Sequence, residues 1–151
     1  MRLELGRETG RKPPFKYSAV TRVGFSDTDA QGVVYYGRYL PYFDLARVEY
    51  HRHLGLLIRD GDTEFVMRAV HVEYHAPARF DDTVEIFVRT ARLGRTSATF
   101  EHAAYLVESD ALMVTAQQTV VSVDLEARKA RPIPESYRAA IRAYEGEDLE
   151  E

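Results

Sequence analysis

The chain has 151 residues, 45% of them hydrophobic, which suits one domain with a single core and gives no reason to divide it. The formal net charge of −4 argues against a general nucleic-acid binder, because such proteins concentrate Lys and Arg to neutralise phosphates. The absence of cysteine excludes disulfides, thiolate metal ligands and a cysteine nucleophile.

The N-terminal half is predicted to contain an arm, a strand and one long helix. Residues 1–14 mix charges, Gly and Pro without a period, which predicts a flexible N-terminal arm. Alternation from Phe15 to Phe25 predicts a strand. A loop follows, and the spacing then becomes helical up to Gly55, a stop signal. The stripe predicted to be buried on this helix consists of Tyr39, Phe43, Ala46, Tyr50 and Leu54.

The C-terminal half is predicted to be mostly strand, because β-branched and aromatic residues alternate with polar ones between turn signals. The predicted strands are Thr63 to Tyr74, Thr83 to Ala91, Thr96 to Glu108 and Ala111 to Asp124. A short helix is predicted at Glu135 to Tyr144, and the acidic end is expected to fray. The predicted organisation is therefore the arm, a domain over residues 15–135, and a C-terminal helix with an acidic tail over 136–151.

This order of elements predicts an α+β fold, an antiparallel sheet of about five strands wrapped around one long helix. The four consecutive strands are expected to form a meander. A sheet of this kind leaves edges that invite pairing with a second copy, so we expect a homodimer or a dimer of dimers.

The loop before the long helix carries the residues best suited to chemistry. Asp27 and Asp29 lie just ahead of the predicted helix start, where outward-pointing N–H groups carry partial positive charge. A carboxylate can attack an electrophile or activate water, and such an N–H can stabilise a developing negative charge, so this loop is a plausible reaction site. The alternative is that both acids only form turns or cap the helix.

Four segments of the sequence carry a family resemblance. Residues 25–40 read Phe-Ser-Asp-Thr-Asp-Ala-Gln-Gly-Val-Val-Tyr-Tyr-Gly-Arg-Tyr-Leu, and residues 43–50 read Phe-Asp-Leu-Ala-Arg-Val-Glu-Tyr. Residues 72–82 read Val-Glu-Tyr-His-Ala-Pro-Ala-Arg-Phe-Asp-Asp, and residues 92–97 read Arg-Leu-Gly-Arg-Thr-Ser. In these segments the sequence resembles the hotdog-fold acyl-CoA thioesterases of the 4-hydroxybenzoyl-CoA thioesterase type.

The resemblance implies two subunits that join their sheets edge to edge, active sites at the subunit interface, and a thioester substrate. It implies that Asp29 is the catalytic carboxylate and that the backbone N–H of Tyr36 polarises the thioester carbonyl. Many relatives of the shorter-chain branch have His at the position of Tyr36, so this chain lacks that possible helper. Asp27 is then expected to be structural.

The chemical role of Asp29 has two readings, direct attack on the thioester to give an anhydride, or orientation of a water; the residues do not decide between them. Glu49, on the long helix, is a secondary candidate because other hotdog thioesterases use a helix-borne acid. A solvated Glu49, or one paired with Arg47 or Arg52, is the alternative.

Substrate contacts are expected from the loop and from basic residues near strand ends. The loop contributes Gly32, Val34 and Tyr35, with glycines serving backbone geometry or close approach. The phosphates of coenzyme A call for exposed basic side chains, and the candidates are Arg92, Arg95, Arg128 and Lys129, with plain surface charge as the alternative. We expect no metal site and no cofactor besides the coenzyme A of the substrate.

Two other functions would fit the same fold. A hotdog dehydratase or hydratase would need a His paired with an acid, and residues 26–40 contain no His. A non-catalytic acyl-CoA or acyl-carrier binding module would bind without releasing thiol. No run approaches the roughly 18 apolar residues of a membrane span, and the start lacks the apolar region of a signal peptide, so we expect a cytoplasmic protein without membrane contact.

Overall fold

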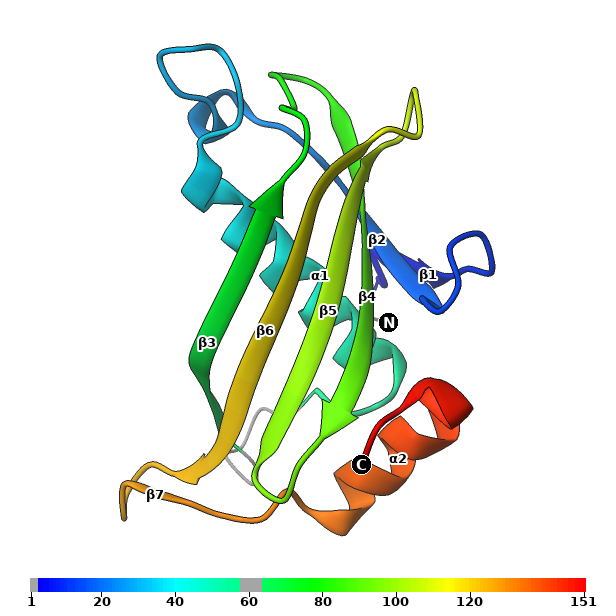
Figure 1. Cartoon of the computed structure of the whole chain (residues 1–151), viewed down its shortest axis with the longest axis vertical. Helices are drawn as coiled ribbons and strands as arrows, with labels where there is room; N and C mark the ends of the chain where they lie inside the picture. Colours follow the sequence, from blue (N-terminus) through cyan, green and yellow to red (C-terminus); the bar gives the residue numbers. More distant parts are fainter. Residues whose placement is uncertain (1–2, 58–63) are drawn as a thin grey trace.

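The structure is a computed structural model that describes residues 3–57 and 64–151 (Figure 1). A long helix, α1, lies against one face of a curved antiparallel sheet, and a second helix, α2, lies beside one end of it. The strands are β1 (Gly6–Glu8), β2 (Tyr17–Arg22), β3 (Glu64–Tyr74), β4 (Thr83–Leu93), β5 (Ser97–Leu106), β6 (Leu112–Asp124) and β7 (Lys129–Ala130). The helices are α1 (Tyr39–His53) and α2 (Glu135–Glu145), with single 3-10 turns at Phe25–Asp27, Tyr36–Arg38 and Gly146–Asp148. The predicted α+β class is confirmed.

The sheet order is β1-β2-β4-β5-β6-β3, with β7 on the end of β6. The predicted meander of four strands is therefore wrong in one respect, because β3 pairs with β6 and not with β4. Tight turns join β4 to β5 and β5 to β6, whereas the longer segment 75–82 crosses the end of the sheet. Strand β3 thus forms one edge, and within the described residues no strand pairs with its outer side.

Helix α1 buries the stripe that its sequence predicts. Tyr39, Phe43, Ala46 and Tyr50 are each at most 2% exposed and pack on the inner face of the sheet. At an apolar coefficient near 25 cal/mol per Å², each large side chain of this stripe contributes roughly 1.5–3 kcal/mol. The helix ends at His53, and Gly55 follows with φ +71, a conformation that favours glycine.

The segments next to both ends of the chain contact the sheet. The arm forms β1 on the edge of β2, and Arg11 pairs with the buried carboxylate of Glu85. The acidic tail returns along β4, where the N–H of Leu93 donates to the carbonyl of Glu150 at 2.9 Å. The sequence indicates neither of these contacts.

The first predicted strand is also shorter than expected. It ends at Arg22, and Phe25 begins a 3-10 turn because the Gly24 N–H donates to the Asp27 carboxylate at 2.9 Å.

No helix in the described part of the chain is long and apolar enough to cross a membrane.

Candidate active site

Asp29 lies in a tight hairpin between β2 and α1. Thr28 and Val34 form an antiparallel bridge, the Asp29 N–H donates to the Val33 carbonyl at 2.9 Å, and Gly32 turns the chain at φ +79. Gly32 therefore serves backbone geometry, one of its two expected roles. The hairpin presents the Asp29 side chain, which is half-buried, at its turn.

The carboxylate of Asp29 has little to restrain it. Its Oδ1 accepts the N–H of Gln31 at 2.8 Å, and within the described residues this is the one hydrogen bond that reaches its carboxylate. The second oxygen is left available to a substrate carbonyl carbon or to a water.

Asp27 has the opposite environment. Its carboxylate accepts hydrogen bonds from the Gly24 N–H at 2.9 Å, from Arg38 at 2.9 Å and from the Tyr42 hydroxyl at 2.8 Å. Burial raises the pKa of Asp27, but these donors outweigh it and leave the pKa below its ordinary value. Asp27 therefore closes the 3-10 turn at Phe25–Asp27 and fastens the loop to the side chains of Arg38 and Tyr42, which is the turn-forming role allowed by the sequence.

The N–H of Tyr36 lies at the start of the 3-10 turn that leads into α1. The first N–H groups of a helix have no partner inside it, and none of the turn and loop hydrogen bonds in the described part of the chain uses this one. Tyr36 also lines a cavity of about 270 Å³ with Val34, Tyr39 and Tyr74. The Tyr74 hydroxyl donates to the Tyr36 carbonyl at 2.8 Å, which ties the end of β3 to this helix start.

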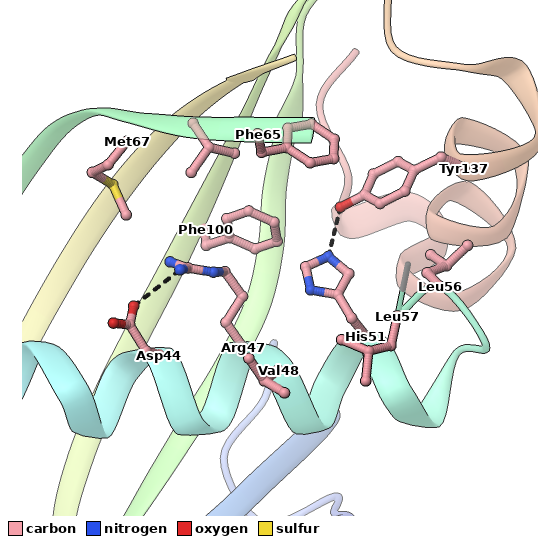
Figure 2. A pocket seen from close by; sticks show the side chains of 11 residues that line it. Asp44, Arg47, Val48, His51, Leu56, Leu57, Phe65, Met67, Phe100 and Tyr137 are labelled. Carbon is pink, nitrogen blue, oxygen red and sulfur yellow. Dashed lines mark hydrogen bonds and ion pairs between the residues drawn. The ribbon is translucent and has the colours of Figure 1, made fainter. Parts of the chain in front are cut away.

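A larger cavity, about 480 Å³, lies between α1 and the inner face of β3 (Figure 2). We call it the α1–β3 cavity. Figure 2 shows its lining side chains converging from α1, from β3, from β5 and from α2. Its walls are mostly apolar: Val48, Leu56, Leu57, Phe65, Met67, Phe100 and Val120, with Asp44, Arg47, His51 and Tyr137 as the polar members.

Arg47 is held on the wall of the α1–β3 cavity by two acceptors. Its guanidinium donates to Asp44 at 2.9 Å and to the Gln118 side-chain oxygen at 2.6 Å. The same Gln118 oxygen lies 2.9 Å from Nε2 of His102, a buried ring stacked on Phe43. Burial lowers the pKa of His102 to about 3, so this ring is neutral at pH 7.

His51 and Tyr137 line the cavity at the end away from Asp44, together with Leu56 and Leu57. Their Nε2 and hydroxyl atoms are 2.6 Å apart, and Figure 2 shows this contact reaching from α1 to α2. Burial, reinforced by the positive charge of Arg47, lowers the pKa of His51 to about 4. Sequence reasoning missed this cavity. Its one local signal is the spacing of Arg47 and His51, which lie four residues apart on α1.

Of the remaining predicted site residues, Val34 and Tyr35 lie at the Asp29 hairpin, and Glu49 does not. Val34 pairs with Thr28 in the hairpin and lines the smaller cavity. Tyr35 is exposed, and its ring lies 4.3 Å from that of Tyr36 between centroids, tilted by 39°. Glu49 is buried, accepts the Leu5 N–H at 3.0 Å and pairs with Arg52 at 3.4 Å, so the alternative of an ion pair with Arg52 is what the structure contains.

The four basic candidates are exposed at the opposite end of the sheet from the Asp29 hairpin, as Figure 1 shows for the β4–β5 turn and for β7. Arg92 faces Glu150 at 3.7 Å. The Ile133 N–H donates to the Arg95 carbonyl at 3.0 Å, which brings the segment after β7 to the β4–β5 turn. Arg95, Arg128 and Lys129 therefore belong to one end of the molecule. The described residues contain no cluster of three metal-ligating side chains.

An antiparallel sheet curved around one long helix, with an acidic hairpin entering that helix, defines a hotdog-fold protein. The family model of the Thioesterase-like superfamily matches residues 23–141, and the chain belongs to that superfamily. The resemblance noted from the sequence is thereby confirmed.

Individual relatives share most of their length with this chain. The acyl-CoA thioester hydrolase YbgC of Escherichia coli O157:H7 is 36% identical over 124 residues, which cover 80% of this chain and 92% of the relative. The crystal structure of a thioesterase complexed with coenzyme A and Zn from Thermus thermophilus is 32% identical, with a TM-score of 0.72 over 84% of this chain and 94% of that one. A thioesterase superfamily member from Jannaschia sp. CCS1, at 24% identity, shares the fold with a TM-score of 0.81 over 89% and 86%.

Proposed function

We propose that this protein hydrolyses an acyl-CoA thioester to the free acid and coenzyme A. The observation that carries the proposal is the Asp29 carboxylate, bound by a single backbone N–H and placed in the hairpin that leads to the unused N–H of Tyr36. The relatives support the reaction class, because a curated homologue of similar length is an acyl-CoA thioester hydrolase. A solved structure of a related thioesterase also holds coenzyme A.

The residues divide the reaction between them. The Tyr36 N–H, helped by the positive end of the α1 dipole, donates to the thioester oxygen and stabilises the negative charge that develops there. The Asp29 carboxylate either attacks the carbonyl carbon and expels the thiolate of coenzyme A, or orients a water that attacks. On the first route a water then cleaves the resulting anhydride; both routes release the same free acid. Glu49 is the weaker catalytic candidate, because its carboxylate is buried against Leu5 and Arg52.

We further propose that two copies build each site. Within one chain the Asp29 hairpin lies at one end of the sheet, whereas the α1–β3 cavity extends toward the other end, where the basic candidates lie. Strand β3 is an unpaired edge in the described part of the chain, and its inner face exposes Met67, Val70 and Tyr74 by 41–50%. A long apolar edge strand of this kind is a template for another chain.

Pairing of two β3 strands about a two-fold axis would join these separated parts. In an antiparallel pair centred on Ala69, Tyr74 of one copy lies opposite Glu64 of the other. Because the Tyr74 hydroxyl binds the Tyr36 carbonyl, the helix start of one copy then approaches the α1–β3 cavity of its partner. Arg95, Arg128 and Lys129 of that partner would lie on the same side for the phosphates of coenzyme A. The assembly is a homodimer or a dimer of such dimers.

The test is the Asp29→Asn variant, assayed by continuous thiol release with short-chain, long-chain and aromatic acyl-CoAs. Loss of the ionised carboxylate should lower kcat by two or more orders of magnitude while the fold is kept. Asp110→Asn is the matched control, since Asp110 lies in the β5–β6 turn at φ 59, a conformation that Asn tolerates.

Two results would contradict the assignment. Turnover of Asp29→Asn at the wild-type rate would remove Asp29 from the chemistry. Saturable binding of acyl-CoA by the wild type, with no thiol released from any substrate, would instead identify a binding module.

A further inference from the structure

One hydrogen-bonded pair, from two elements that are far apart in sequence, lines the end of the α1–β3 cavity away from Asp44. His51 comes from the last turns of α1 and Tyr137 from the first turn of α2, and 2.6 Å separates their polar atoms. Phe65 packs on Tyr137 with ring centroids 5.3 Å apart, and Phe100 lies 5.4 Å from His51. Figure 2 shows the rings of Phe65, His51 and Tyr137 right of centre, with the ring of Phe100 beside His51 nearer the middle of the view.

The two polar atoms satisfy each other away from water: Nε2 of His51 and the hydroxyl of Tyr137 form one short hydrogen bond, in which the tautomer of the ring decides which atom donates. Moving Tyr137 aside would leave the half-buried His51 ring without this partner, which makes the pair resistant to opening.

We propose that the His51–Tyr137 pair is the specificity-determining end wall of the acyl pocket. It admits apolar acyl groups up to a fixed length and rejects longer ones. This inference rests on the proposed function, since it assigns the α1–β3 cavity to the acyl group of the thioester. The cavity suits that role: its volume is in the range of ligand sites, and Val48, Phe65 and Phe100 make its walls apolar.

The end wall should appear as a limit in how kcat/KM depends on the length of the acyl chain. A hydrophobic pocket gains about 10–200-fold in kcat/KM for each methylene that it accommodates. Below the limit, kcat/KM should therefore rise steeply with chain length. Beyond it, a further methylene must displace the Tyr137 ring or remain in water, so the gain stops and kcat/KM falls.

The experiment compares saturated acyl-CoAs of increasing length with three proteins: wild type, Tyr137→Ala and Tyr137→Phe. Tyr137→Ala removes the wall and should shift the longest accepted acyl group by several carbons, with at least tenfold higher kcat/KM above the wild-type limit and little change for acetyl-CoA. Tyr137→Phe keeps the ring, so its length limit should match that of the wild type. Ile141→Ala, one turn later on α2 and fully buried outside the cavity, controls for loosening of this helix.

Binding separates this inference from the proposed function. Non-hydrolysable thioether analogues of the same acyl-CoAs are titrated by calorimetry, and Kd should show the same limit and the same shift in Tyr137→Ala. A wild type that binds the analogues with this limit but hydrolyses nothing would overturn the function and support the end wall. Length profiles that coincide for wild type and Tyr137→Ala, in both Kd and kcat/KM, would overturn the end wall. A shift of equal size in Ile141→Ala would overturn it as well.

Discussion

Two carboxylates two positions apart in one loop have different environments because different donors reach them. Asp27 accepts hydrogen bonds from a backbone N–H, an arginine and a tyrosine, whereas the Asp29 carboxylate accepts one from the Gln31 N–H. A carboxylate with several donors is fixed in place and weakly basic, while one with a single donor keeps an oxygen for chemistry. Asp27 thus supports the loop, and Asp29 is the carboxylate whose environment permits the proposed reaction.

Asp27→Asn should therefore reduce stability more than it alters the chemistry. An amide keeps one acceptor oxygen but loses the charge that binds Arg38 and strengthens the Tyr42 hydrogen bond. Hydrogen bonds to charged groups contribute about 1.5–3 kcal/mol, so the free energy of unfolding should fall by roughly that amount. Urea unfolding measures it. An unchanged midpoint would show that these contacts do not hold the loop.

The same carboxylate makes stability depend on acid. Its pKa is lower in the folded protein than in the unfolded chain, so the unfolded state binds more protons as the pH falls below about 4. The contribution of Asp27 is complete above that pH and is lost as the pH drops through the folded pKa. Unfolding of wild type between about pH 5 and 2.5 should show this loss, and Asp27→Asn should show a smaller one. If the free energy of unfolding fell equally with pH in wild type and Asp27→Asn, Asp27 would not be the group responsible.

At the scale of elements, the five longer strands and both helices follow from local patterns, but β1, β7 and the sheet order do not. Alternation and turn signals define β2 to β6, and the stripe of Tyr39, Phe43, Ala46 and Tyr50 defines α1. No local pattern states that β3 pairs with β6, since that depends on where the segment 75–82 crosses. The contacts next to both ends of the chain were missed for a related reason: Glu85 and Glu145 form them with residues that are distant in sequence.

Helix α2 is attached through a buried carboxylate. Oε2 of Glu145 accepts the Tyr50 hydroxyl at 2.6 Å and the Thr90 N–H at 2.9 Å, and Lys16 lies 3.8 Å from Oε1. Burial raises the pKa of Glu145; these two donors, Lys16 and Arg89 oppose the rise without cancelling it. The Glu145 carboxylate therefore lowers the free energy of unfolding at any pH at which it is ionised.

Glu145→Gln should consequently be more stable than the wild type at pH 7, in contrast with most changes of a buried polar residue. The wild-type carboxyl makes its full contribution to the free energy of unfolding below its pKa in the unfolded chain, about 4.3. This contribution is lost as the pH rises through the higher pKa of the folded protein. The amide keeps an oxygen for Tyr50 and Thr90 and does not ionise. Urea unfolding at pH 4 and pH 7 should show a smaller change for Glu145→Gln. A variant less stable than wild type at both values would contradict this.

At the scale of the whole molecule, the sequence indicates the hairpin proposed to carry the reaction but not the cavity. Asp29, Tyr36 and their order along the chain are contained in one contiguous motif. The α1–β3 cavity is assembled from α1, β3, β5, β6 and α2, so its lining becomes recognisable only when the sheet order and the position of α2 are known. The same holds for the basic residues, which would adjoin a reaction centre only across two copies.

If two copies pair through β3, a charge on the inner face of this strand should dissociate the dimer. Val70 is 41% exposed there, and Val70→Asp would place an unpaired carboxylate inside the contact. Light scattering after size exclusion should show a monomer for this variant. Val20→Asp is the matched control, because Val20 is 39% exposed on β2, away from β3. Retention of the wild-type mass by Val70→Asp would exclude this edge as the interface.

A site shared between copies predicts complementation between two inactive variants. Asp29→Asn removes the reactive carboxylate, and Val48→Trp fills the α1–β3 cavity from a partly exposed position on α1. Consider a heterodimer of one Asp29→Asn chain and one Val48→Trp chain. One of its sites combines both defects. The other takes an intact hairpin from the Val48→Trp chain and an open cavity from the Asp29→Asn chain. Co-expression with two different tags isolates this species, which should recover about half of the wild-type activity, one intact site of two. If each chain held a complete site, the heterodimer would be as inactive as its parents.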